Sequence, residues 1–168
     1  MTTQDTQVFG PESFEATLYF STSEEHFKAN RVSVEETTTP SGVVCWTLKA
    51  YEDTQDKKDG TTEINTLRLH IKKDFAGGPV QIVSALSPPD IRENSAAYYK
   101  LKDSPDDDDD LVDTAYEFPS IKGELVYSWP DNRARITGAF NFKVKNPDNT
   151  TFEIKGAYNI LNKGMHSI

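Results

Sequence analysis

The residues with the clearest capacity for chemistry are the carboxylates of residues 103–117, DSPDDDDDLVDTAYE. Four of them match ligand positions of a calcium-binding loop, namely Asp106, Asp108, Asp110 and Glu117. The sixth position of that loop needs a glycine for its sharp turn, but here it is Leu111, and the usually apolar eighth position is Asp113. We therefore expect little or no calcium binding and assign no metal site to the chain.

The same carboxylates could instead meet a basic protein surface. The residues that would do so are Asp106, Asp107, Asp108, Asp109, Asp110 and Asp113. The net charge of the chain is -9, and residues 103–117 hold eight acidic residues and no Lys or Arg, which leaves about one negative charge for the rest. Because five consecutive aspartates repel one another and cannot pack against apolar groups, we expect residues 103–111 to form a solvated loop. Nucleic acid is not an expected partner, because binding it requires a concentrated basic surface.

Other catalytic or cofactor signals are weak. The histidines, His26, His70 and His166, are scattered without the spacing of a zinc site, and Cys45 has no neighbouring basic motif that would activate a thiolate. The sequence contains no G-x-S-x-G, Walker-type or G-x-G-x-x-G motif. We expect a protein without a cofactor and without enzymatic activity.

Aromatic side chains offer a second kind of binding site. The chain has nine Phe, seven Tyr and two Trp. If the fold is a barrel with an open mouth, Trp46, Tyr98 and Trp129 are the candidates to contact a small apolar or carbohydrate ligand there. The alternative is that the aromatic residues simply fill a core.

Short segments of alternating apolar and polar residues must position these side chains. Ten of them read as strands: 14–20, 27–35, 42–51, 62–72, 79–85, 94–101, 112–118, 121–129, 134–145 and 150–161. The connections are short and rich in Gly, Pro, Asn and Asp, which favours hairpins over parallel crossovers. The sequence therefore predicts one antiparallel all-β domain, either a barrel or a two-sheet sandwich.

The clearest alternation occurs in the last two predicted strands. One face of them carries Phe140, Phe142, Phe152, Ile154 and Tyr158. The opposite face is mostly polar, so one side of this hairpin is expected to be buried. We expect that aromatic face to lie in the protein's own core.

The same alternation predicts a register for the last three strands. We pair Tyr127 with Ile136, and Val144 with Phe152. This register places Phe140 between Gly123 and Gly156, where an aromatic ring covers backbone that has no side chain of its own. A slip of one residue would turn polar side chains into the core.

The C-terminal motifs resemble a family of small, uncharacterised bacterial β-proteins of the calycin-like type. They are G-x-L-V-x-S-W at 123–129, ITGAFNF at 136–142 and FEIKGAYNI at 152–160, preceded by GGPVQI at 77–82 and SAAYYK at 95–100. The resemblance covers roughly residues 62–160. It implies a calycin-like fold and carries over no catalytic residue, because its motifs consist of glycines and aromatics.

The chain length and the N-terminal residues bear on the number of domains and on the location of the protein. A chain of 168 residues fits one domain, here residues 13–168 with a flexible tail at 1–12. No apolar run is long enough for a membrane span, and the N-terminal residues lack the pattern of a secretory signal. The default expectation is a cytoplasmic binding protein for a small ligand, with non-classical export left open. The alternative is an immunity- or antitoxin-like protein that presents its acidic loop to a basic partner.

Overall fold

The computed structural model describes residues 9–55, 60, 62–74, 77–85, 92–102 and 114–168. Within these ranges the chain forms eleven strands and one short 3-10 turn. They are β1 Ser13–Tyr19, β2 Glu24–Lys28, β3 Arg31–Thr38, β4 Val44–Gln55, β5 Thr62–Lys72, β6 Gly78–Ile82, β7 Ser95–Lys102, β8 Thr114–Ser128, η1 Asp131–Arg133, β9 Arg135–Lys145, β10 Thr151–Leu161 and β11 His166–Ser167.

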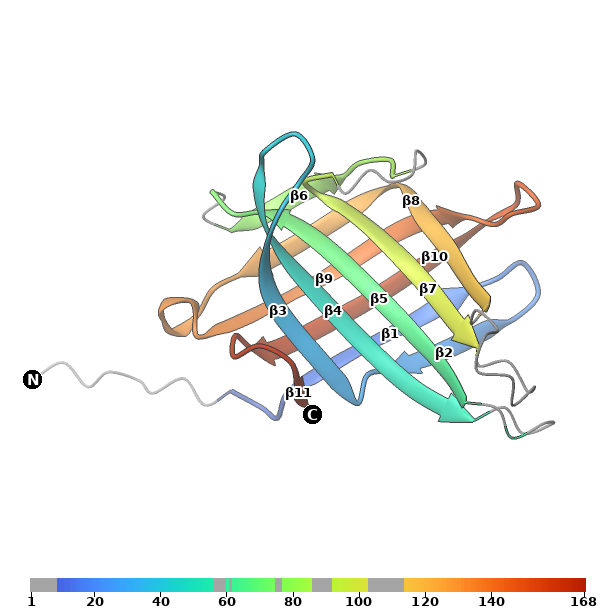
Figure 1. Ribbon diagram of the computed structural model, residues 1–168, viewed down its shortest axis with the longest axis horizontal. Helices are drawn as coiled ribbons and strands as arrows, with labels where there is room; N and C mark the ends of the chain where they lie inside the picture. The colour runs from blue at the N-terminus through green and yellow to red at the C-terminus, as the bar shows by residue number, and fades with distance from the viewer. Residues whose placement is uncertain (1–8, 56–59, 61, 75–76, 86–91, 103–113) are drawn as a thin grey trace, which may run out of the picture.

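All the strands belong to one antiparallel sheet that is curled into a half-barrel (Figure 1). The order along the sheet is β11-β3-β4-β5-β7-β8-β9-β10-β1-β2, and β6 pairs with β8 beside β7. Figure 1 shows β3, β4, β5 and β7 as one layer, crossed by a second layer of β9, β10, β1 and β2. The expected antiparallel all-β fold is confirmed, with the sheet only partly closed.

The core lies between these two layers and is packed with side chains from both. The five residues of the aromatic face, Phe140, Phe142, Phe152, Ile154 and Tyr158, are all buried in it. Leu48, Leu67 and Leu69 bring the opposite layer into the same cluster. The prediction that the aromatic face lies in the protein's own core is confirmed.

The predicted register is right for one strand pair and wrong for the other. Between β9 and β10, Val144 pairs with Phe152 as predicted. Between β8 and β9, Phe140 lies opposite Leu125 and not Gly123, so the prediction there is wrong by two residues. The pairing ends at Ser128 and Thr137, because the connection contains η1 and is longer than the predicted four-residue loop.

Strand boundaries differ from the prediction in two places. The predicted strand 27–35 is split into β2 and β3 at Ala29 and Asn30, and each half pairs with a different neighbour. The predicted strands 112–118 and 121–129 are one continuous strand, β8, which passes through Pro119 and changes register between Ser120 and Lys122. β11 was missed because its two residues carry no periodic signal.

The first described residues contact the C-terminal part of the chain. Residues 9–12, assigned to a flexible tail from the sequence, contact β9, β10 and β11. The carboxylate of Glu12 accepts a hydrogen bond from the Leu161 N–H at 2.7 Å and lies 2.7 Å from Nε2 of His166. Burial raises the pKa of Glu12, but the hydrogen bonds from Leu161 and His166, together with the charges of His166 and Lys163, lower it by more, so the net pKa is lowered.

This arrangement predicts a pH-dependent contribution to stability. A carboxyl group with a lowered folded-state pKa stabilises the fold above its unfolded pKa of about 4.3, and the stabilisation is lost as the pH falls through the folded-state pKa. Glu12→Gln should therefore destabilise the protein at neutral pH, and its effect should shrink as the pH falls through the folded-state pKa of Glu12. Urea unfolding at several pH values measures this, with exposed Glu15→Gln as the control that changes little. An effect of Glu12→Gln that is independent of pH would contradict it.

In the part of the chain that the structure describes, no helix is long and apolar enough to cross a membrane.

Candidate functional site

The bend of β8 creates an opening in the half-barrel. From Ser120 to Ser128, β8 is paired with β9 on one side. Residues 114–119 continue into the other layer, where they pair with β7 only. On their second side, the described part of the chain places no strand. The gap between residues 114–119 and the β9–β10 turn at 146–149 is called the notch below, and it lies near the C-terminal end of β7, because Lys100 lines it.

The notch has a cavity on each side of β8. The inner one has a volume of about 490 Å³, and its lining residues are Phe20, Lys100, Tyr116, Phe118, Asn146, Pro147 and Asp148. The outer one has a volume of about 270 Å³ and is lined by Glu117, Pro119, Lys145, Asn146, Pro147 and Asn149. Even-numbered residues of β8 thus line the inner cavity and odd-numbered residues line the outer one, as strand geometry requires.

Tilted and edge-to-face ring contacts fix the inner wall of the notch. Phe118 lies 5.6 Å from Tyr98 and 5.6 Å from Phe152, and Phe20 lies 4.8 Å from Phe152, measured between ring centroids. Phe20 and Phe118 are therefore partly buried and held against the core. Tyr116 is different, since 48% of it is exposed and it projects at the rim. The notch combines a rigid aromatic wall with one accessible tyrosine.

Polar groups of the β9–β10 turn face this wall. The Asp148 carboxylate accepts hydrogen bonds from the N–H of Thr150 at 2.9 Å and from its hydroxyl at 2.5 Å. These bonds, the side-chain one first, lower the pKa of Asp148 and keep it ionised near neutral pH. The Asn146 side-chain amide donates to the Thr150 hydroxyl at 2.9 Å, which fixes the turn further.

Charged side chains of both signs also border the notch. The Lys100 ammonium lies 4.0 Å from the Glu25 carboxylate. Glu117 accepts a hydrogen bond from the Tyr99 hydroxyl at 3.1 Å. Glu117, suggested by spacing as a closing calcium ligand, is therefore engaged with a tyrosine. Among the described residues, no group of three His, Cys, Asp or Glu side chains could hold a metal ion.

The aspartates proposed for partner binding, Asp106, Asp107, Asp108, Asp109, Asp110 and Asp113, lie outside the described residues. The two flanks of their segment are placed, because Lys102 at the end of β7 pairs with Thr114 at the start of β8. Both ends of the acidic segment are thus attached at the notch.

The three aromatics proposed for ligand binding do not form one site. Trp46 and Trp129 come together, with ring centroids 5.3 Å apart, and Lys73 lies 5.3 Å from the Trp46 ring centroid. Lys73 also forms an ion pair with Glu36 at 2.7 Å. Tyr98 is 2% exposed and belongs to the wall behind the notch. Burial raises its pKa, and the nearby carboxylates of three glutamates raise it further, so its hydroxyl stays protonated.

The surroundings of the buried residues His70 and Cys45 favour the uncharged form of each side chain. His70 is 2% exposed, its Nδ1 lies 2.7 Å from the Thr47 hydroxyl, and burial, followed by Arg68 and Lys49, lowers its pKa to about 3. Burial raises the pKa of the Cys45 thiol, so it stays protonated and unreactive near neutral pH.

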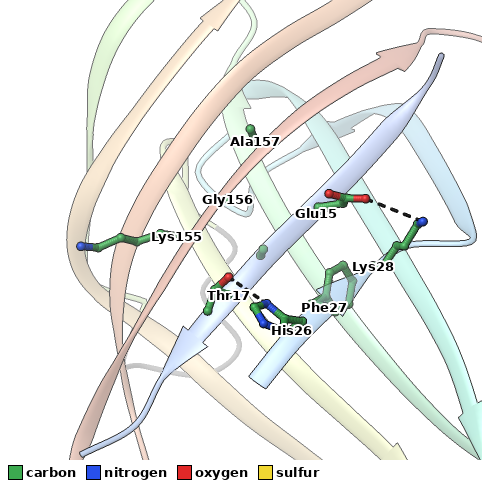
Figure 2. A pocket seen from close by; sticks show the side chains of 9 residues that line it. Glu15, Thr17, His26, Phe27, Lys28, Lys155, Gly156 and Ala157 are labelled. Atoms are coloured by element: carbon green, nitrogen blue, oxygen red, sulfur yellow. Dashed lines mark hydrogen bonds and ion pairs between the residues drawn. The ribbon is translucent and has the colours of Figure 1, made fainter. Parts of the chain in front are cut away.

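A further cavity of about 520 Å³ lies over β1, β2 and β10 (Figure 2). Gly156 and Ala157 line its base, where they have no side chain or only a methyl group to fill the space above β10. At its rim, Glu15 lies 3.9 Å from Lys28, and the Thr17 hydroxyl lies 3.3 Å from a ring nitrogen of His26. These are contacts between exposed side chains, which hold one another only weakly.

No family model, no curated protein and no solved structure matches this chain. The resemblance to calycin-like bacterial proteins therefore stays a prediction.

The notch residues were not predicted as a site from the sequence. Tyr116 and Phe118 alternate just before Pro119, and NPDN at 146–149 is a recognisable turn. No signal in the sequence places that turn opposite that strand, because the apposition depends on where β9 ends and on the bend of β8.

Proposed function

We propose that this protein is a non-enzymatic interaction module that binds a basic protein partner at the notch end of the half-barrel. The observation that carries the proposal is the Lys102–Thr114 pair, which attaches both ends of the acidic segment beside the notch. The segment 103–117, with eight acidic residues, is therefore anchored at one end of a domain whose remaining residues are near neutral in net charge.

Chain length limits how far this charge can spread. Eleven residues separate Lys102 from Thr114, so the middle of the segment can reach about 20 Å from its attachment points. Carboxylates gathered at one end attract a basic surface and speed its association, and the attraction weakens as salt shortens the Debye length from about 10 Å at 0.1 M. A basic partner is therefore drawn to the end where the aromatic wall can add apolar contacts.

A titration with octalysine tests the electrostatic part of this proposal. Calorimetry at low and high salt should show binding that weakens markedly as salt rises. Replacing residues 103–111 with a Gly/Ser linker of equal length should leave the melting temperature nearly unchanged and abolish binding. The control removes acidic residues elsewhere on the sheet, at Glu124 and Glu153, and should retain binding. Equal binding by the linker variant would contradict the proposal.

A second candidate function is the binding of a small apolar or carbohydrate ligand in the inner cavity. The observation that favours it is the exposed ring of Tyr116 close to Asn146 and Asp148, since sugars are held by an aromatic face together with polar groups. A cavity of about 490 Å³ is also within the range of small-ligand sites. Titration with cellotriose and with 1-anilinonaphthalene-8-sulfonate tests this candidate, and no response of the Tyr116 ring by NMR would contradict it.

A further inference from the structure

The notch exposes backbone as well as side chains. In a strand, the N–H and C=O groups of successive residues point alternately to its two edges. Residues 114–119 of β8 use one edge to pair with β7, and no described strand pairs with the other edge. About half of their backbone donors and acceptors therefore face the notch, where a further strand could use them.

The place for such a strand is set by β9. β9 pairs with β8 from Ser128 back to Ser120 and ends at Lys145, where the chain turns away into residues 146–149. An added strand would occupy the position that β9 would have taken had it continued along β8. Pro119 lacks an N–H, so it limits pairing at that end and leaves residues 114–118 as the usable edge.

The two cavities lie where the side chains of an added strand would project. Successive residues of an extended peptide point to opposite faces of a sheet. Those on the inner face would meet Phe20, Tyr116 and Phe118, which form an apolar wall. Those on the outer face would meet the rim at Glu117, Lys145 and Asn149, where the two side-chain charges offset each other, and would lie near the attachment points of the acidic segment.

We propose that the notch binds an extended peptide segment of alternating apolar and basic residues, which adds to the free edge of β8 as a new antiparallel strand. This inference rests on the proposed function and names the form that the basic partner takes. Backbone hydrogen bonds hold the segment in register, the aromatic wall selects its apolar side chains, and the acidic charge at this end selects its basic ones.

Two eight-residue peptides of alternating valine and lysine test the backbone contribution. The first is unmodified, and the second carries N-methyl groups on alternate backbone amides, which removes donors along one edge while the charge is unchanged. A third peptide with glutamate in place of lysine reports the charge requirement. Calorimetry gives each Kd, and hydrogen exchange of the full chain, followed residue by residue by NMR, shows where the backbone becomes protected.

The unmodified peptide should bind at least about tenfold more tightly than the N-methylated one, and it should slow amide exchange within residues 114–118. The glutamate peptide should not bind. Tyr116→Ser should weaken binding of the unmodified peptide, while Tyr19→Ser, which removes a tyrosine of similar exposure from β1, should not.

Two results would overturn the inference. The first contradicts strand addition alone, and the second contradicts the proposed function as well. If both lysine peptides bind equally and residues 114–118 gain no protection, strand addition is wrong, but a basic partner held by charge remains. If neither the lysine peptides nor octalysine binds, strand addition and the proposed function both fail.

Discussion

Phe140→Ala is expected to lower the free energy of unfolding by about 3–5 kcal/mol. The ring of Phe140 is 4% exposed and lies 5.5 Å from that of Phe14, 5.8 Å from Phe142 and 6.3 Å from Tyr158, measured between centroids. It also fills the space beside Gly156, where no side chain can take its place. Truncation removes the buried area of the ring and leaves a cavity that neighbouring strands cannot close, because their hydrogen bonds fix the spacing.

Urea denaturation of the wild type and the variant measures this loss. Asn141→Ala, on the exposed face of the same strand, is the matched control and should change stability by less than about 0.5 kcal/mol. A loss below about 1 kcal/mol for Phe140→Ala would mean that the half-barrel is not closed over this face in solution.

Gly138→Val should have the second large effect. A side chain at Gly138 would collide with the Val126 backbone oxygen and would come within 2.6 Å of the Tyr158 hydroxyl oxygen. The tyrosine can turn away only by disturbing the core, and the backbone oxygen belongs to the paired strand β8, so neither yields easily. We expect destabilisation at or above the upper end of the usual overpacking range of about 1–3 kcal/mol.

The neighbouring residue provides the control for this change. Ala139 is exposed on the opposite face of β9, so Ala139→Val adds the same branched carbons where there is room. Its melting temperature should stay within a few degrees of the wild type, whereas that of Gly138→Val should fall well below it or the variant should fail to fold. Equal melting temperatures for the two variants would contradict the close packing of Tyr158 over Gly138.

The fold could be predicted from the sequence wherever alternation and turn length agreed. The pairing of Val144 with Phe152 followed from two alternating strands joined by a short Asn- and Pro-containing turn, and it is confirmed. The pairing of β8 with β9 was wrong by two residues because a shift of two keeps every side chain on its correct face. Only the length of the connection could fix it, and η1 at Asp131–Arg133 lengthened that connection without a strong signal.

The candidate site was less predictable than the fold. The tryptophans at positions 46 and 129 do meet, but Tyr98 lies in the aromatic wall at the notch, because strand pairing carried it there. The notch itself arises from a strand that is paired on both edges along one half and on a single edge along the other. Alternation within β8 reports which faces are buried, but it carries no information about which edge lacks a neighbour.

An NMR titration of the isotopically labelled full chain with the unmodified valine–lysine peptide tests binding at the notch most directly. We expect the largest shift changes on residues 114–119, Phe20 and the turn at 146–149. We also expect the resonances of Trp46, Trp129 and the cavity around His26, over β1, β2 and β10, to remain unchanged. Shift changes centred on the tryptophan pair or on the His26 cavity, with the notch unaffected, would contradict strand addition at the notch.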